Sequence, residues 1–242
     1  MISIVTVSHG HHKDIEKLVS SLSQYMKLSY EFILIDNLNS SFDYEEVCHR
    51  FEIPNFKVIN NISAMSFSIN NNIGVSLCSY EKVVLLNPDI CLIANSLNNY
   101  LEESCIVDGL FFPSLLNLDG SKQVSGKAKP NIYDQMLTFF ASILSYKRES
   151  PAGNYWYFAA AVIFNKDFFY KLGGFDIKFP MYAEDTELCD RCHAFKAPVM
   201  LLENIKLQHG LGGDSKSKYI FKAVISNLYL RFKMFQNKKL TR

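Results

Sequence analysis

The feature that most constrains the fold is a strand, a helix and a second strand within the first 36 residues. Ile2 to Val7 is rich in β-branched residues and predicts a buried strand. Apolar residues then recur at helical spacing behind Asp14, and Tyr30 to Asp36 predicts another buried strand. This order is typical of a parallel sheet whose ligands bind at the carboxyl ends of its strands. Asp36, at such an end, is a candidate contact to a base or a ribose, and a strand-end helix cap is the alternative.

The same alternation continues to residue 89. Phe56 to Ile59 and Lys82 to Leu86 predict two more strands, with a helical region from Ser66 to Leu77 between them. Pro88 stops the fourth strand and turns Asp89 out of the sheet at its ligand-binding edge. A carboxylate there suits a divalent cation bound to a diphosphate. The sequence therefore predicts an α/β fold with a Rossmann-like, mostly parallel sheet flanked by helices.

The composition fits one folded globular domain. The 242 residues are 48% hydrophobic and 20% charged, which is enough to bury a substantial core. No apolar stretch reaches the roughly 18 residues of a membrane span, and Met1 to Val7 has no basic flank typical of a signal peptide. The six cysteines show no framework spacing, so we expect reduced thiols and a cytoplasmic protein.

The second half of the domain is less regular. Ile132 to Tyr146 predicts a strongly apolar helix, and Trp156 to Phe164 and Pro198 to Leu202 predict two more strands. The last strand leads into a Gly-rich loop that carries a single histidine, His209. With no internal repeat and no low-complexity linker, residues 1–215 form one predicted domain.

The segment from Leu172 to Arg191 is chemically the densest. Gly173 and Gly174 allow the backbone to approach a ligand closely. Glu184 and Asp185 then begin a predicted helix. Adjacent carboxylates of this kind are candidates for general base chemistry. The alternative is that both acids only complement the dipole at the amino end of the helix.

Four motifs in this order resemble the inverting, nucleotide-sugar-dependent glycosyltransferases of family 2, which have a GT-A fold. Over roughly residues 2 to 235, the chain is similar to bacterial rhamnosyltransferases that build surface polysaccharide. The motifs are Leu85-Leu86-Asn87-Pro88-Asp89, Asn117-Leu118-Asp119-Gly120-Ser121, Trp156 followed by Leu172-Gly173-Gly174-Phe175-Asp176, and Tyr182-Ala183-Glu184-Asp185-Thr186-Glu187-Leu188-Cys189-Asp190-Arg191. The resemblance implies a metal-dependent hexosyltransferase whose partners are a nucleotide-sugar donor and a saccharide acceptor, expected to be lipid-linked.

The resemblance also implies roles for individual residues. Asp185 would be the general base, with Glu184 as a positioning or backup group. Asp89 and His209 would hold Mg²⁺ or Mn²⁺ against the diphosphate. The residues implied to bind the donor are Thr6, Ser8, Asp36, Asn72, Asn87, Trp156, Gly173 and Gly174. The loop after the first strand reads Ser8-His9-Gly10 where relatives read Ser-Tyr-Asn. The donor therefore stays open between dTDP-rhamnose and a UDP-hexose.

Two other function classes compete with this interpretation. A sugar-nucleotide nucleotidyltransferase would also use an α/β sheet and a metal-bound aspartate, but it should carry a Gly-rich, Arg-containing loop after the first strand. Ser8 to Asp14 is not such a loop. A degenerate, non-catalytic glycosyltransferase-like binding protein would have no reason to keep both Asp89 and the Glu184-Asp185 pair.

The end of the chain is a basic tail, residues 216–242. It holds eight Lys and Arg and no acid, whereas the whole chain has a net charge of only +1. From Tyr219 to Phe235 the apolar residues fall near one helical face: Phe221, Ile225, Leu228, Phe232 and Phe235. This pattern predicts an amphipathic helix at the anionic inner face of the cytoplasmic membrane. The alternative is a helix that packs on the domain with its basic side in water.

Overall fold

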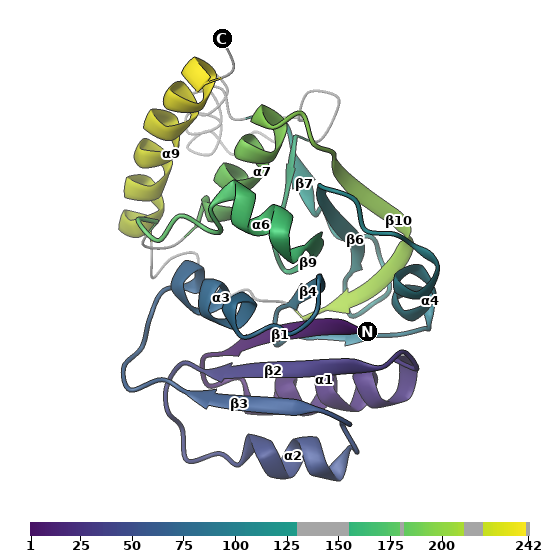
Figure 1. Ribbon diagram of the computed structural model, residues 1–242. Helices are drawn as coiled ribbons and strands as arrows, with labels where there is room; N and C mark the ends of the chain where they lie inside the picture. Colours follow the sequence, from purple (N-terminus) through teal and green to yellow (C-terminus); the bar gives the residue numbers. More distant parts are fainter. Residues whose placement is uncertain (130–154, 180–181, 211–219, 241–242) are drawn as a thin grey trace.

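The computed structural model describes residues 1–129, 155–179, 182–210 and 220–240 (Figure 1). The first part of the chain forms four neighbouring parallel strands in the order β3-β2-β1-β4. Their bounds are β1 Ile2–Ser8, β2 Tyr30–Asp36, β3 Phe56–Asn60 and β4 Lys82–Leu86. The parallel sheet predicted from the first 89 residues is confirmed, because each strand is a short apolar run that can be buried on both faces.

The second part of the chain completes the sheet with strands of mixed direction. The order continues β4-β9-β6-β10-β5, in which β9 and β5 run antiparallel to their neighbours and β6 pairs with β10 in parallel. These strands are β5 Ile90–Leu92, β6 Leu110–Leu116, β9 Ala161–Asn165 and β10 Val199–His209. A separate hairpin pairs β7 Gly126–Lys127 with β8 Trp156–Tyr157.

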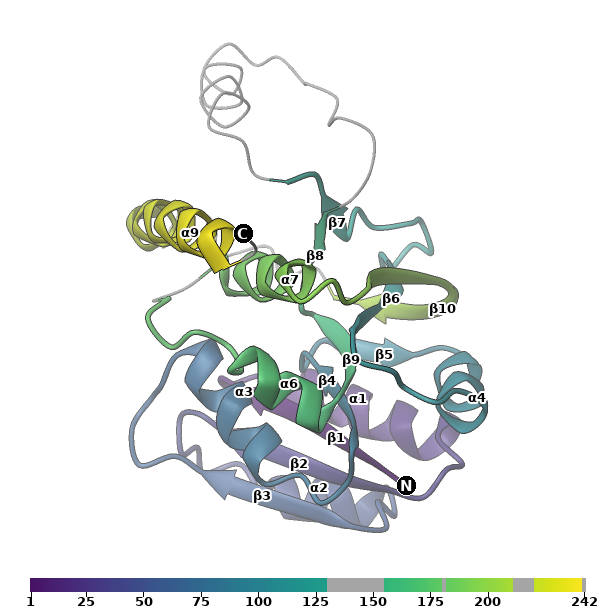
Figure 2. The same cartoon turned by 45° about the horizontal axis from the view of Figure 1, so that its top comes forward.

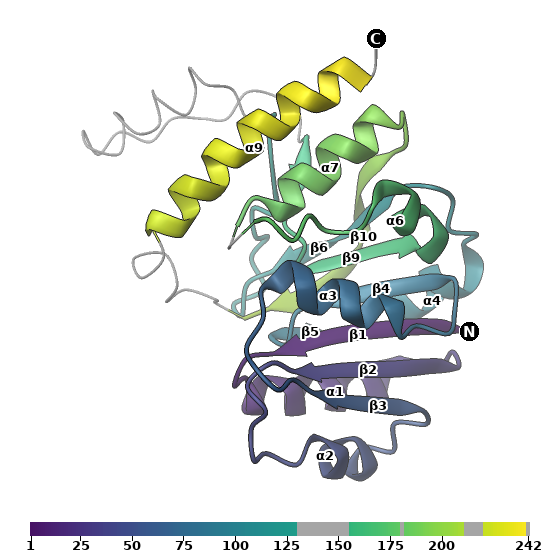
Figure 3. The ribbon, with the colours of Figure 1, turned by 60° about the vertical axis from the view of Figure 1, so that its left-hand side comes forward.

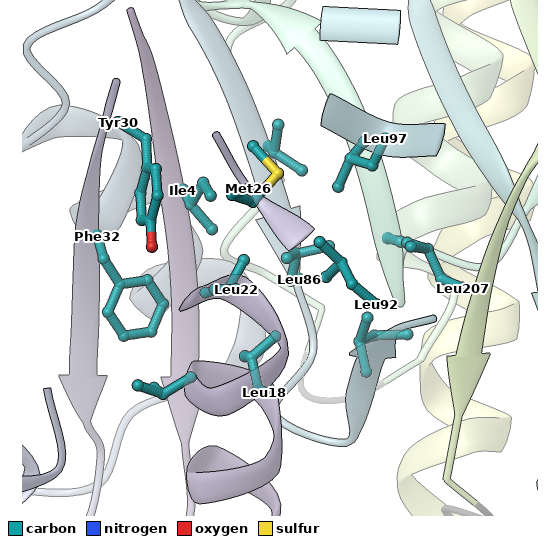
Figure 4. Close-up of a cluster of buried hydrophobic side chains, with 14 of the residues drawn as sticks. Ile4, Leu18, Leu22, Met26, Tyr30, Phe32, Leu86, Leu92, Leu97 and Leu207 are labelled. Atoms are coloured by element: carbon teal, nitrogen blue, oxygen red, sulfur yellow. The ribbon is translucent and has the colours of Figure 1, made fainter. Parts of the chain in front are cut away.

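Helices cover both faces of the sheet. Alternate strand residues point to opposite faces, so Ile4 packs against α1 and Val5 packs beneath α3. Figure 4 shows the first of these cores, where Leu18 and Leu22 of α1 meet the sheet. The helices are α1 His12–Tyr25, α2 Tyr44–Arg50, α3 Phe67–Ser76, α4 Ser96–Glu103, α6 Lys166–Leu172, α7 Glu184–Ala194 and α9 Ile220–Leu240.

The last strand is longer than predicted. Its register against β6 shifts between Leu202 and Lys206, opposite Pro113, which has no N–H to donate to the ladder. The predicted strand ended at Leu202, where this irregularity begins, but the observed strand continues to His209. His209 is therefore the last residue of a strand and does not lie in a loop.

The predicted strand from Trp156 to Phe164 is two strands. β8 belongs to the hairpin, β9 belongs to the main sheet, and a turn at Ala159 and Ala160 separates them. The apolar run hides this break, because both strands and the turn use apolar residues. The predicted helix from Ile132 to Tyr146 lies outside the described residues.

The C-terminal helix α9 lies alongside α7 (Figure 3). Leu230 and Met234 point inward and form a small core with Phe179. Two bonds tie the same face to the loop before α7: Tyr229 donates a hydrogen bond to Asp176, and Lys233 pairs with Asp176 at 2.9 Å. The helix is thus packed on the domain along one face.

Candidate functional site

The site lies at the carboxyl edge of the parallel strands, where β1, β2 and β3 end in polar residues. Three asparagines form a hydrogen-bonded network there: Asn61 donates to both Asn37 and Asn70 at 3.0 and 2.7 Å. Asn37 also contacts a ring nitrogen of His9 at 2.9 Å and accepts from the backbone of Met65. This network joins the loops that follow β1, β2 and β3 and makes the edge rigid.

Asp36 is fully buried at the end of β2. Its carboxylate accepts hydrogen bonds from the backbone of Leu38 at 3.1 Å and from both the backbone and the hydroxyl of Ser40, at 2.5 and 2.7 Å. These bonds hold the turn that follows β2. They are the kind of bond expected from the alternative role considered for Asp36, a cap at the end of a strand.

Two other predicted donor residues lie in the floor of this edge. Ser8 shares a hydrogen bond with the hydroxyl of Tyr44 at 2.8 Å and accepts one from the backbone of His11. The hydroxyl oxygen of Thr6 is buried and has no hydrogen-bond partner among the described residues. A buried hydroxyl without a partner is rare in folded proteins.

Asp89 and His209 come together although 120 positions separate them in the chain. His209 Nε2 lies 3.4 Å from Asp89 Oδ1, and both side chains are partly exposed. The other ring nitrogen of His209 contacts Gln123 at 2.7 Å, which orients the imidazole. Gly210 allows the close approach, because a Cβ there would lie 3.1 Å from the Cβ of Asp89.

This pair fits a divalent cation that is shared with a phosphate-bearing ligand. Carboxylate and imidazole are suitable ligands for Mn²⁺, and Mg²⁺ is usually held by one or two carboxylates together with phosphate oxygens and water. No group of three or more His, Cys, Asp or Glu side chains suited to a metal occurs in the described part of the chain. The protein would therefore supply only part of the coordination from these residues.

The turn at Ala159 and Ala160 connects Asp185 to the strand that carries Asp89. The backbone N–H of Ala159 lies near the carboxylate of Asp185 and favours its charged form. The next residue, Ala160, accepts a hydrogen bond from the backbone of Asn87 at 2.7 Å. Two consecutive residues, Ala159 and Ala160, thus lie between the amino end of α7 and the end of β4, where Asn87 is half-buried.

Burial perturbs both carboxyls at the start of α7. It raises the pKa of Asp185 to about 6, despite hydrogen bonds from Thr186 and Ala159 that favour the charged form. Burial and the neighbouring Asp185 charge raise the pKa of Glu184 further, to about 8. Glu184 Oε2 is buried and has no hydrogen-bond partner among the described residues. At neutral pH the pair therefore favours one negative charge over two.

The backbone before these acids is strained. Tyr182 and Ala183 have φ values of 67° and 71°, in the left-handed region that residues with a Cβ rarely adopt. Ala183 is the N-cap residue of α7 and has no side chain that can cap the helix. The first two helical residues are the acids themselves. Strain of this kind persists only where surrounding contacts over-determine it, and it gathers at functional sites.

A second pair on α7 fixes the Gly-Gly turn. Glu187 is fully buried and binds the guanidinium of Arg191 through both carboxylate oxygens, at 2.6 to 2.9 Å. Arg191 also donates to the carbonyls of Leu172 and Gly174. Sequence reasoning did not find this role, although Glu187 and Arg191 have the i, i+4 spacing that predicts an ion pair.

The Gly-Gly turn is also held from the other side. Asn72 of α3 donates to the carbonyl of Phe175 at 2.8 Å and accepts from its N–H at 2.9 Å. Gly173 and Gly174 have positive φ, and a Cβ on Gly174 would lie 2.8 Å from the Asn72 side chain. Gly173 and Gly174 therefore form the turn, and the side-chain amide of Asn72 is bonded to the backbone that follows them.

Trp156 lies on the hairpin beside α7 (Figure 2). It is half-buried and packs edge-on against Phe158, with ring centroids 5.1 Å apart. Its partner strand places Lys127 over both rings. Trp156 is thus separated from the asparagine network and lies on the Asp185 side of the site.

Comparisons with known proteins agree with this geometry. No family model matches the sequence. The rhamnosyltransferase WbbL of Escherichia coli (strain K12) is 27% identical over 206 residues, which cover 79% of this chain and 76% of WbbL. The mannosyltransferase PcManGT of Pyrobaculum calidifontis, solved with GDP-Man and Mn²⁺, has a TM-score of 0.65 at 11% identity and covers 97% of this chain. TarS of S. aureus, solved with UDP-GlcNAc, has a TM-score of 0.60 at 13% identity and covers 86%.

The fold is therefore that of the GT-A glycosyltransferases, and the predicted fold class is confirmed. Within this class, the predicted resemblance to rhamnosyltransferases of family 2 is also confirmed by the similarity to WbbL. The chain spans 64% of the length of the mannosyltransferase structure and 58% of the TarS structure.

Proposed function

We propose that this chain is an inverting, metal-dependent glycosyltransferase that moves a hexosyl group from a nucleotide sugar to a saccharide acceptor. The observation that carries the proposal is the pair of backbone links from Asp185 through Ala159 and Ala160 to Asn87. They join a buried carboxylate of raised pKa to the strand end that carries Asp89. A proton acceptor next to a candidate diphosphate site is the arrangement that glycosyl transfer needs.

Asp185 takes the proton of the acceptor hydroxyl as that oxygen attacks the anomeric carbon. General base catalysis of this kind contributes typically ~10²- to 10⁴-fold. Glu184, protonated beside it, keeps a second negative charge away from the base. Attack opposite the leaving nucleoside diphosphate inverts the anomeric centre, and the Arg191 pair and Asn72 keep the Gly-Gly turn in place during this step.

Asp89 and His209 would hold Mg²⁺ or Mn²⁺. When bound, such a cation neutralises the charge that develops on the leaving diphosphate. Asn87, two residues before Asp89, is proposed to bind the donor through its amide. Thr6, Ser8 and Asp36 are proposed to form the nucleoside end of the donor site, with the unpartnered Thr6 hydroxyl as its polar contact.

The donor proposed is dTDP-rhamnose, with a UDP-hexose as the alternative. The relative WbbL is named a rhamnosyltransferase, and TarS was solved with UDP-GlcNAc. The acceptor proposed is a lipid-linked saccharide of surface polysaccharide synthesis, to which the family resemblance points. Release of nucleoside diphosphate from a panel of nucleotide sugars, with and without added acceptor, tests the reaction. NMR of the product at the new anomeric centre tests inversion, and retained configuration would contradict it.

Metal dependence has its own test. We expect Asp89→Ala and excess chelator each to abolish transfer, while circular dichroism and the melting temperature of the variant stay close to those of the wild type. Asp108→Ala is a matched control, because Asp108 is an exposed acid that pairs with Lys171 on the surface. Full transfer in excess chelator would contradict the proposal.

Helix α9 is proposed to hold the enzyme peripherally at an anionic membrane. No helix in the described part of the chain is long and apolar enough to cross a bilayer. The face of α9 opposite to Leu230 and Met234 leaves large apolar side chains 43% to 64% exposed: Ile225, Leu228, Phe232 and Phe235. The surrounding sequence is basic without an acid. An apolar face flanked by basic residues suits a helix that lies in the headgroup region.

Vesicle binding tests this part of the proposal. We expect the protein to sediment with phosphatidylglycerol-containing vesicles but not with phosphatidylcholine vesicles, and salt to release it. Leu228→Glu with Phe232→Glu should abolish binding while the inward face of α9 stays intact. Phe195→Glu is the control, because Phe195 is equally exposed outside α9. Equal binding to both kinds of vesicle would contradict the proposal that α9 binds an anionic membrane.

A further inference from the structure

The hairpin of β7 and β8 carries an aromatic surface that the donor site does not use. Trp156 and Phe158 are two residues apart, so their side chains leave the same side of the backbone. Tyr157, between them, points the other way and is buried against Phe112 at 5.2 Å between ring centroids. Trp156 and Phe158 are instead partly exposed, although Trp156 also packs against the core around Phe112. The hairpin thus presents one aromatic pair outward and anchors itself with the residue between them.

This pair is fixed in one geometry. The rings meet edge to face at 5.1 Å with an interplanar angle of 86°, an arrangement that aromatic pairs prefer. The ammonium group of Lys127 lies 6.0 Å from the centre of the Trp156 ring and 5.6 Å from that of Phe158. The backbone of Phe158 donates to Ser125 at 2.8 Å. We call Trp156, Phe158 and Lys127 the hairpin platform.

The hairpin platform adjoins the proposed base. Phe158 directly precedes Ala159, whose N–H lies near the Asp185 carboxylate. Consecutive Cα atoms are about 3.8 Å apart, so the platform begins one residue from the contact to the base. The partner strand β7 begins three residues after Gln123, which contacts His209. A molecule on the platform would therefore lie beside the carboxylate that must receive its proton.

We propose that the hairpin platform is the acceptor subsite and that it binds a saccharide ring by stacking. One face of a pyranose ring presents C–H groups, which pack on the electron-rich face of an aromatic ring. Lys127 can donate hydrogen bonds to the hydroxyls of that sugar. This inference rests on the proposed glycosyl transfer, and it moves Trp156 from the donor, to which the family resemblance assigned it, to the acceptor.

The chain contains a built-in probe of this site, because Trp156 is its single tryptophan. With excitation at 295 nm, we expect its fluorescence to change on titration with at least one of the methyl glycosides of glucose, galactose, rhamnose and N-acetylglucosamine. UDP-GlcNAc and dTDP-rhamnose with Mn²⁺ should cause no change beyond that of free tryptophan in the same solutions. A response to the nucleotide sugars and not to the glycosides would return Trp156 to the donor site and overturn the inference.

Variants separate the acceptor site from the reaction itself. Phe158→Leu and Trp156→Phe should raise the KM for the glycoside about tenfold, while acceptor-independent hydrolysis of the nucleotide sugar and its KM change less than twofold. Phe195→Leu, an equally conservative change of an exposed ring outside the platform, should change neither. Melting temperatures of the variants check that each is folded.

Two failures have different meanings. If the wild type neither binds nor hydrolyses a nucleotide sugar with Mg²⁺ or Mn²⁺, the proposed function is wrong and the acceptor subsite falls with it. If hydrolysis proceeds but no glycoside changes the tryptophan fluorescence, or the platform variants keep the wild-type KM for the glycoside, the acceptor inference alone is wrong.

Discussion

Asp36 and Asp185 both accept hydrogen bonds from the residues that follow them, but Asp36 is fully buried without an acid next to it, whereas Asp185 is partly buried and follows Glu184. Asp36 accepts three hydrogen bonds within the turn that follows it. Asp185 lies beside Glu184, and burial raises the pKa of both. The backbone before Asp185 is strained, with φ positive at two consecutive residues. An isolated, hydrogen-bonded acid stabilises the fold, whereas two adjacent acids removed from water cost stability and have the raised pKa values that are typical of functional sites.

The two halves of the site differ in the same way. The end of β2 and β3 is a closed amide network in which Asn37, Asn61 and Asn70 satisfy one another. The start of α7 instead contains a buried carboxylate oxygen, Glu184 Oε2, without a hydrogen-bond partner in the described residues. Under the proposed function, the first half is a rigid support and the second is the reactive part. Each of the following experiments tests that distinction.

The largest expected effect is on turnover in Asp185→Asn. Removing the base should lower the rate of transfer by ~10²- to 10⁴-fold, while donor affinity, measured by calorimetry, stays within about twofold. The amide is nearly isosteric, so the melting temperature should not fall. If Asp185→Asn retains transfer and Glu184→Gln loses it, the roles of the two acids are reversed.

Asp36→Ala should act mainly on stability. It leaves the backbone N–H groups of Leu38 and Ser40 without their acceptor in a buried turn. We expect the free energy of unfolding to fall by about 2 to 4 kcal/mol, as measured by urea denaturation. Asp43→Ala provides a comparison, because Asp43 caps α2 at an exposed position and should cost only about 1 kcal/mol. An equal loss in both variants would show that burial of Asp36 adds nothing.

The pH dependence of the reaction distinguishes the Asp185 environment from that of an ordinary carboxylate. The base must be deprotonated, and burial raises its pKa to about 6. The value of kcat/KM should therefore fall about tenfold for each pH unit below 6, and it should be constant just above. Glu184→Gln removes the neighbouring acid, and its kcat/KM should still fall at acidic pH. If kcat/KM begins to fall only near pH 4, the pKa of Asp185 is not raised.

The smallest expected effect is the pH dependence of stability at Glu184. Its folded-state pKa, about 8, lies above the ordinary value of 4.5. The native state therefore keeps a proton that the unfolded chain releases, so stability falls as the pH rises through this interval. Between pH 5 and pH 9 the wild type should therefore lose more stability than Glu184→Gln, which has no carboxyl to titrate at this position. Parallel stability curves for the two proteins would contradict the prediction.

The sequence predicted the first half of the fold to within one residue at most strand ends. β1 to β4 are contiguous apolar runs, and their polar ends mark the ligand edge without further information. The second half was harder, because its irregularities carry no local signal. The break at Ala159 lies inside an apolar run, and the register shift in β10 depends on Pro113 in another strand.

The site was predictable in its parts but not in its connections. The acids of α7 and Asp89 stand out by type and position, and the resemblance to a family suggested His209. The hydrogen bond from Asn72 to Phe175 joins residues 103 positions apart. No pattern of residue spacing in the sequence predicts this contact. The same holds for the peptide groups that join Asp185 to Asn87. These contacts arise only when the two halves of the sheet are assembled.

The packing of α9 has a consequence for how the protein is made. Ala183, the residue before the two acids, packs against the small core of Phe179, Leu230 and Met234. The loop that sets the base in place is therefore completed by residues that leave the ribosome after the rest of the site. While a chain is being synthesised, the edge formed by β1 to β4 can therefore assemble early, whereas the loop before Asp185 gains its packing partners only when residue 234 has emerged.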